Sequence, residues 1–278
     1  MTVQQFNSKI ELTNSGHLSL FFIGTGSAFT KKAFQTNLLA IKGNDHILID
    51  CGTLCPYALV NDYNTRLGKI ENVLITHPHA DHIGGMEEMA LVGRYIEKRK
   101  VNLIIPKPLK NKLWKESLRG GLQFSEEGKL KFEDYFNIIN APRIQKKPFE
   151  MFEKQFGSIN IKIFRTRHVT SSSKSLHNSQ LSYGMIFDNK ILFTADSQFN
   201  QNQLNYLLDN YKIETIFHDC DLLGFSIGVH ASYDQLKTLP ADVKSKIYLC
   251  HYNDIKDKPD VTKDGFLGYA QAGIYYNF

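Results

Sequence analysis

The sequence predicts an α/β fold, because short apolar runs with strand character alternate with stretches of helical periodicity. The runs are rich in β-branched and aromatic residues and end at Gly, Asn or Asp, as strands do. In the first part of the chain they are LSLFFIG (18–24), TNLLAI (36–41), HILIDC (46–51), NVLITH (72–77) and VNLIIP (101–106). In the second part they are INIKIFRTR (159–167), YGMIF (183–187), ILFTA (191–195), IETIF (213–217) and KIYLCH (246–251).

Two segments between these runs are predicted to be helical. GGMEEMALVGRYIEKRK (84–100) places apolar side chains on one face and carries acidic residues near its start and basic residues near its end. Both features favour a helix. The stretch 106–148 is rich in Lys, Gly, Phe and Glu, contains the only tryptophan, Trp114, and shows little strand pattern. We expect it to be a helical insertion.

Composition limits the class of protein. The chain has 278 residues, 42% hydrophobic and 22% charged, which is ordinary for a globular protein, and we expect a single domain over 1–278. No stretch approaches the roughly 20 apolar residues of a membrane helix. The polar N-terminus shows no secretory signal, and four cysteines are few, so a cytoplasmic location is the default. The net charge of +5 fits an anionic substrate without requiring one.

The stretch ITHPHADHIGG (75–85) carries the main chemical signal. It places His77, His79, Asp81 and His82 within six positions, between a strand end and a helix start. Imidazole and carboxylate ligands together suit Zn²⁺ or a similar divalent ion. Neighbouring ligands on one loop cannot all reach one ion without strain, but they can divide between two ions about 3.5–4 Å apart.

Further candidate ligands stand where other apolar runs stop. Asp50, His168, Asp196 and His251 each follow or end such a run. Any one of them alone is more often a turn residue, but their agreement with the first cluster favours a shared metal site.

These residues resemble the metallo-β-lactamase superfamily from about residue 20 to residue 250, and THPHADH matches its His-x-His-x-Asp-His signature. The resemblance implies a four-layered αββα sandwich and two divalent ions, zinc or alternatively manganese. His77, His79 and His168 would hold the first ion; Asp81, His82 and His251 would hold the second, with Asp196 bridging. Asp50 would orient a ligand imidazole.

Two stretches resemble the phosphodiesterase branch, which includes the tRNA 3′-processing ribonucleases. GVHASYDQL (228–236) is similar to a motif whose histidine helps the leaving oxygen depart, so His230 would be catalytic together with Asp81. The other interpretation of His230 is an ordinary residue in a loop before a helix capped by Ser232. IFHDCD (216–221) looks like a variant of a second motif, and we expect His218 to be structural or to support a ligand.

GTGSAF, QTNLLA, IDCGT and ADHIGGMEE followed by GRY are similar to the anti-Pycsar phosphodiesterases of bacteriophages and their bacterial relatives. That resemblance implies hydrolysis of 3′,5′-cyclic mononucleotides, including cyclic CMP and cyclic UMP. It also implies a homodimer in which one subunit's loop covers the other's site. The location would be the host cytoplasm for a phage-encoded chain. Thr170, Ser171 and Ser172 could contact base or sugar, or form a polar loop.

Three alternatives remain open. A ribonuclease Z-like enzyme needs an RNA-binding surface, but segment 106–148 mixes basic and acidic residues, which is more typical of a solvated helical surface. A protein that sequesters a nucleotide needs no water-activating metal pair. Another hydrolase of the same fold would act on esters, thioesters or sulfates.

Cys51 and Cys55 could pass for a metal-binding pair, but no second cysteine pair completes a tetrahedral site.

Overall fold

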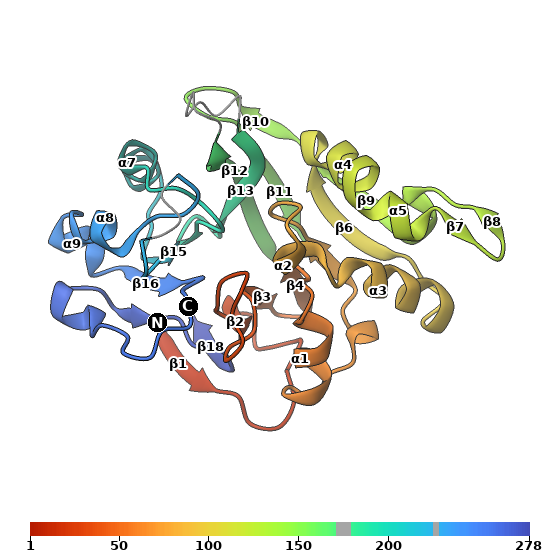
Figure 1. Cartoon of the computed structure of the whole chain (residues 1–278), viewed down its shortest axis with the longest axis horizontal. Helices are drawn as coiled ribbons and strands as arrows, with labels where there is room; N and C mark the ends of the chain where they lie inside the picture. Colours follow the sequence, from red (N-terminus) through yellow and green to blue (C-terminus); the bar gives the residue numbers. More distant parts are fainter. Residues whose placement is uncertain (171–178, 225–227) are drawn as a thin grey trace.

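The computed structural model describes residues 1–170, 179–224 and 228–278, and it consists of two large sheets packed face to face with helices on their outer sides (Figure 1). The predicted αββα sandwich is confirmed. The strand order of the first sheet is β1 (Thr2–Gln5), β18 (Ile274–Asn277), β2 (Ser19–Gly24), β3 (Asn37–Lys42), β4 (Asp45–Ile49), β5 (Asn72–Leu74), β6 (Val101–Pro106) and β9 (Phe136–Ala141). The order of the second is β10 (Arg143–Gln145), β11 (Met151–Phe156), β12 (Ile159–Thr170), β13 (Ser179–Phe187), β14 (Ile191–Phe193), β15 (Thr215–Asp219), β16 (Ile247–Cys250) and β17 (Gly268–Tyr269).

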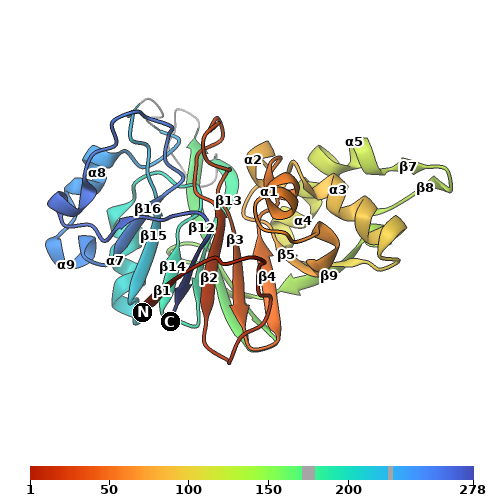
Figure 2. The same cartoon turned by 90° about the horizontal axis from the view of Figure 1, so that it is seen from below.

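Helices cover the outer faces of both sheets (Figure 2). On the first sheet the helical segments are α1 (Cys55–Asn61), η1 (Leu67–Lys69), α2 (Ala80–Ile83), α3 (Met86–Leu91), η2 (Val92–Ile96), α4 (Lys107–Leu113), η3 (Trp114–Leu118), α5 (Arg119–Leu122) and α6 (Phe132–Tyr135). On the second they are α7 (Gln201–Asn210), α8 (Tyr233–Lys237), α9 (Ala241–Lys244) and η4 (Val261–Asp264). None of the helices in the described ranges is long and apolar enough to span a membrane.

Aromatic side chains join the two sheets at their inner faces. Phe22 of β2 packs against Phe217 of β15, with ring centroids 4.9 Å apart, and against Phe193 of β14 at 6.5 Å. All three are at most 1% exposed. A second apolar cluster, between the other face of the second sheet and α7 to α9, includes Leu207 and Leu236. Burial of these side chains, each worth roughly 1.5–3 kcal/mol, fixes the sheets relative to one another.

The direction of the strands brings the candidate ligands to one edge of the sandwich. Strands β4, β5 and β6 are parallel, as are β14, β15 and β16. Two antiparallel pairings separate β12 from β14, so these two strands also run in the same direction. Polar residues that follow β4, β5, β14 and β16, and those near the end of β12, therefore gather where the carboxyl ends meet. Ligand sites of open α/β sheets lie at this position.

The expectation for segment 106–148 is correct only for its first part. Residues 107–122 are helical, and Trp114 stacks on Phe132 at 5.2 Å. After the hairpin β7 (Phe124–Ser125) and β8 (Gly128–Lys129) and helix α6, strand β9 pairs with β6 and strand β10 with β11. The second part therefore completes the edges of both sheets. Edge strands bury little of their surface, and only the end residues of β9 are buried, so the apolar alternation there is weak.

Candidate metal centre

Four of the predicted ligands form one group at the common strand edge. Ligand atoms of His77, His79, His168 and Asp196 all lie within 4.8 Å of one another. His79 Nδ1 is 3.0 Å from His77 Nε2 and 3.2 Å from His168 Nε2. The two latter nitrogens lie 3.7 and 3.9 Å from Asp196 Oδ2. Three residues from the β5 and β12 ends thus face the carboxylate that follows β14.

The other predicted ligands form a second group around the same carboxylate. Asp81, His82, Asp196 and His251 also have ligand atoms within 4.8 Å of one another. Asp196 Oδ2 lies 3.4 Å from His82 Nε2 and 3.3 Å from His251 Nε2, and Asp81 Oδ2 lies 3.1 and 3.4 Å from the same two nitrogens. Asp196 is therefore common to both groups, as the sequence predicts for a bridging ligand.

Three candidate ligand histidines form hydrogen bonds through the ring nitrogen that faces away from Asp196, and these bonds select the tautomer of each neutral ring. Thr76 Oγ1 donates to Asp50 Oδ2 at 2.7 Å and accepts from His77 Nδ1 at 3.0 Å. His82 Nδ1 donates to Asp50 Oδ2 at 2.7 Å, and His168 Nδ1 donates to the Val229 carbonyl at 2.9 Å. In the neutral imidazole the outer nitrogen carries the proton, so each inner nitrogen then presents a lone pair to the cluster. Such partners are typical of metal-binding histidines.

The inner nitrogens need a cation. His79 Nδ1 carries at most one proton, so it cannot satisfy the lone pairs of both His77 and His168. His82 Nε2 is buried and has no hydrogen-bond partner among the described residues. Unpaired buried polar atoms are rare in folded proteins. Nitrogen and carboxylate ligands around such atoms fit divalent metal ions of the zinc type.

Proton binding differs between the two groups. Burial lowers the pKa of His168 to about 4, so this imidazole is neutral at pH 7. Burial alone would also lower the pKa of His251, but the negative charge of Asp196 and contacts with Asp219 and Asp81 raise it to about 10. A metal ion among the same carboxylates competes with that proton, since histidine binds metals in its neutral form.

The sequence analysis did not assign a role to Asp219, the last residue of β15. Its carboxylate is fully buried; Oδ2 accepts from His230 Nδ1 at 2.7 Å and from the Ser197 amide at 2.8 Å. Oδ1 faces His251 Nδ1 at 3.5 Å. Asp219 therefore touches both a predicted ligand and the predicted catalytic histidine. The signal that could have identified it is its position, since it ends a strand as Asp50 does.

His230 lies beside the metal-ligand cluster. Its ring centroid is 5.1 Å from that of His168 and 4.8 Å from that of His251. Burial lowers the pKa of His230, but the charge of Asp219 outweighs this effect and the pKa lies above its usual value. The Asp219 contact fixes the proton on Nδ1 and orients the ring. Ser232 caps α8, as the other interpretation of this stretch expects.

The remaining candidates lie apart from the cluster or carry other contacts. Thr170 Oγ1 accepts from Gln198 Nε2 at 3.0 Å, whereas Ser171 and Ser172 lie outside the described residues. His218 is buried and donates from Nδ1 to the Asp219 carbonyl at 2.7 Å. All four cysteines, Cys51 and Cys55 among them, are buried free thiols.

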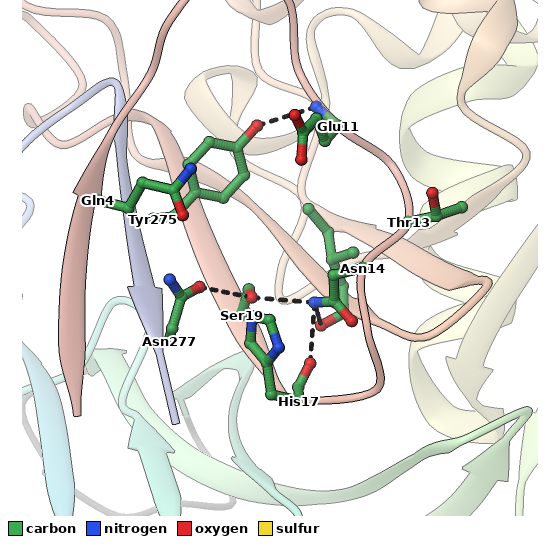
Figure 3. Close-up of a pocket in the computed structure, with 9 residues that line it drawn as sticks. Gln4, Glu11, Thr13, Asn14, His17, Ser19, Tyr275 and Asn277 are labelled. Atoms are coloured by element: carbon green, nitrogen blue, oxygen red, sulfur yellow. Dashed lines mark hydrogen bonds between the residues drawn. The ribbon is translucent and has the colours of Figure 1, made fainter.

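His17 lies at the opposite end of strand β2 and belongs to a separate polar pocket (Figure 3). Ser19, the first residue of β2, links Asn14 to Asn277 through hydrogen bonds of 3.0 and 2.7 Å. By contrast, the loop after Gly24, the last residue of β2, contacts Tyr252 next to His251. Asn14, His17, Ser19 and Asn277 are joined by hydrogen bonds, which suits a structural role.

Unusual backbone geometry accompanies the ligands. Asp50, Ala195 and His251 have φ values of +64°, +48° and +57°, a region that side-chain-bearing residues seldom adopt. Such conformations persist where the surrounding structure enforces them, commonly at functional sites. Gly52 shows the tightness of the packing, because a Cβ atom there would lie 1.9 Å from the Asp81 carbonyl oxygen.

Comparison with known proteins agrees with this geometry. The family model for anti-Pycsar protein Apyc1 matches residues 18–276. The chain belongs to this family. It is 33% identical to an anti-Pycsar protein Apyc1 of Paenibacillus xerothermodurans, over 94% of this chain and 98% of the relative. It is 34% identical to that of Bacillus phage vB_BsuM-Goe3, over 91% of this chain and 96% of the relative.

Solved structures show the same fold. The metallo-β-lactamase fold protein YhfI from Bacillus subtilis matches with a TM-score of 0.68 and 14% identity, covering 94% of this chain and 100% of that chain. The short form of human tRNase Z matches with a TM-score of 0.60 and 15% identity, covering 93% and 98%. The chain thus has the metallo-β-lactamase fold. Together with the His and Asp clusters, membership in the anti-Pycsar family identifies it as a metal-dependent hydrolase.

Proposed function

We propose that this chain is a phosphodiesterase that uses two divalent metal ions, most simply zinc, to open the 3′,5′-cyclic phosphate of cyclic mononucleotides, cyclic CMP and cyclic UMP among them. The observation that carries the proposal is the pair of four-residue groups that share Asp196, with His230 beside them. Family membership over nearly the whole chain supports the same role, the removal of cyclic nucleotides that signal phage infection.

The residues of the site would have separate roles in binding the metal ions and in proton transfer. His77, His79 and His168 would hold one ion, Asp81, His82 and His251 the other, and Asp196 would contact both. When bound, such a pair supplies a hydroxide near neutral pH and neutralises phosphate charge. Asp81, whose burial opposes ionisation but whose His82 and His251 contacts lower its pKa overall, stays ionised and accepts or orients the proton of the attacking water.

His230 acts on the leaving side. Asp219 fixes the proton on Nδ1 in the neutral ring, so a second proton on Nε2 gives the form that can donate to the leaving 3′ oxygen. Transfer from a positioned acid contributes roughly 10²–10⁴-fold to a rate. The buried Asp219 carboxylate stabilises that doubly protonated ring.

The charges of the helical segment favour a small substrate over RNA. Lys112 pairs with Glu116 at 2.8 Å, and Lys110 pairs with Glu133 at 2.8 Å. Arg94, at the end of the preceding helix, pairs with Glu127. Cations paired in this way are poorly available to a polyanion, whereas a nucleic-acid surface presents unpaired Lys and Arg.

We also propose a homodimer in the cytoplasm, which would be the host cytoplasm for a phage-encoded chain. An apolar surface on α3 and η2 supports self-association: Ile96 is 66% exposed and borders a cavity that Leu91, Val92 and Tyr95 also line. Apolar surface of this kind is common at subunit interfaces. We expect light scattering of the purified protein to give the mass of two chains; a stable one-chain mass at micromolar concentration would contradict the dimer.

Removal of Asp196 should release the metal ions. Elemental analysis of the purified protein should give close to two divalent ions per chain, and Asp196→Ala should lose both or hold them weakly, because the residue faces four imidazoles. Asp188→Asn, which removes a carboxylate that pairs with Lys42 at 2.7 Å, is the control and should keep both ions. A single ion in fully active protein would rule out the dinuclear site.

Removal of His230 should affect substrates according to their leaving group. His230→Ala should lower turnover of a cyclic nucleotide by roughly 10²–10⁴-fold, because the alkoxide needs a proton to depart. Turnover of bis(p-nitrophenyl) phosphate should fall much less, since p-nitrophenolate leaves without help. His17→Ala, outside the site, should change neither rate. Equal losses of His230→Ala on both substrates would exclude a role at the leaving oxygen.

Substrate class can be tested with a panel that contains cyclic mononucleotides, a precursor tRNA and a thioester. We expect efficient hydrolysis of the cyclic mononucleotides, with KM changing less than about threefold between 50 and 200 mM salt. A substrate with one phosphate releases few counterions, whereas six to ten phosphate contacts would cost roughly 10³–10⁵ in affinity over that range. Processing of precursor tRNA with cyclic nucleotides left intact would establish the ribonuclease instead.

A further inference from the structure

Four consecutive residues that include His230 are all held by hydrogen bonds to other segments of the site. Gly228 O accepts from Gln198 Nε2, Val229 O accepts from His168 Nδ1 at 2.9 Å, and His230 Nδ1 donates to Asp219 at 2.7 Å. The Ala231 amide donates to Ser197 O at 2.9 Å, and Ala231 O accepts from the Asp221 amide at 2.8 Å. We refer to residues 228–231 as the histidine loop. Two of these hydrogen bonds come from Ser197 and Gln198, which directly follow the shared ligand Asp196.

Gln198 connects the histidine loop to the end of strand β12. Its side chain is buried, with 8% of the residue exposed, and its amide donates to both Gly228 O and Thr170 Oγ1. The backbone amide of Gln198 donates to the Arg167 carbonyl at 2.7 Å, which fixes the residue against β12 on the other side of His168. The Gln198 carboxamide therefore joins the end of β12 to the histidine loop. Thr170 lies two positions from His168, and Gly228 lies two positions from His230.

The histidine loop depends on such supports because its own backbone constrains it little. Gly228 has φ of +89°, a conformation that glycine adopts freely, so the start of the loop has no intrinsic preference for the observed path. A donor to a leaving oxygen must be placed to within a few tenths of an ångström to be effective. Loss of the bond at Gly228 O would let the loop, and the His230 ring with it, move away from the cluster.

We propose that Gln198 is a positioning residue for His230: it contacts neither the reacting atoms nor the metal site, and it holds the histidine loop in place through Gly228. This inference rests on the proposed phosphodiesterase function for its kinetic consequence. Its structural consequence, tighter packing of the histidine loop, does not depend on any substrate.

The test compares Gln198→Leu with Gln203→Leu. Both remove a side-chain amide that donates to a backbone carbonyl, but Gln203 donates to Arg165 O at 2.8 Å and does not contact the histidine loop. Gln198→Leu should lower kcat on a cyclic nucleotide about tenfold, as expected for one lost hydrogen bond at a positioned group, and should leave bis(p-nitrophenyl) phosphate nearly unaffected. Gln203→Leu should leave the ratio of the two rates unchanged.

Hydrogen exchange supplies the second measurement. The Ala231 amide should exchange faster in Gln198→Leu than in the natural protein, and at the natural rate in Gln203→Leu. If Gln198→Leu does not fold, Gln198→Asn, which is one methylene too short to reach both acceptors, serves in its place. Unchanged exchange at Ala231, or equal losses on both substrates, would overturn the positioning role. A natural protein inactive on cyclic nucleotides would instead reject the proposed function and leave the exchange result to decide this inference.

Discussion

The structure depends on one electrostatic constraint: the buried Asp196 carboxylate faces the ring nitrogens of four histidines. Asp196 Oδ2 lies between 3.3 and 3.9 Å from the Nε2 atoms of His77, His82, His168 and His251. Lone pairs and a carboxylate in a buried space repel one another unless cations stand between them. Protons or a divalent metal ion must therefore neutralise this edge, and a bound metal would stabilise its fold as well as supply its chemistry.

Much of the surrounding structure serves to maintain that arrangement. Asp50 accepts from His82 and from the Thr76 that fixes His77, and Asp219 contacts both His251 and His230. Each buried carboxylate therefore contacts two candidate site positions, and together they connect both ligand groups with His230. Asp50 and His251 have left-handed backbone conformations, which are unfavourable for residues with a side chain. The hydrogen bonds of the buried site offset the free-energy cost of these conformations.

The position of the site follows from topology, and its selectivity follows from what surrounds it. Parallel strands deliver ligands from both sheets to one edge, which explains why residues 50 to 251 meet there although they are distant in sequence. The short form of human tRNase Z has the same fold at 15% identity. We therefore expect the substrate to be selected outside the ligand set; in segment 107–122, Lys110 and Lys112 are paired with acidic residues.

The sequence alone predicted the candidate ligands that the structure brings together, because His-x-His-x-Asp-His and the polar residues at strand ends are local patterns that together are typical of a two-metal site. The recurring apolar runs of strand length also predicted an α/β fold, and the resemblance to the metallo-β-lactamase superfamily implied the two-sheet sandwich. Apart from Asp50, only the tertiary structure decided which residues support the candidate ligands. Asp219 contacts His230, which is 11 positions away, and Gln198 contacts Gly228, which is 30 positions away. Contacts between such distant residues leave no periodic pattern in the sequence. Edge strands β9 and β10 were likewise decided by pairing, because a strand that buries little of its surface leaves a weak pattern in its own sequence.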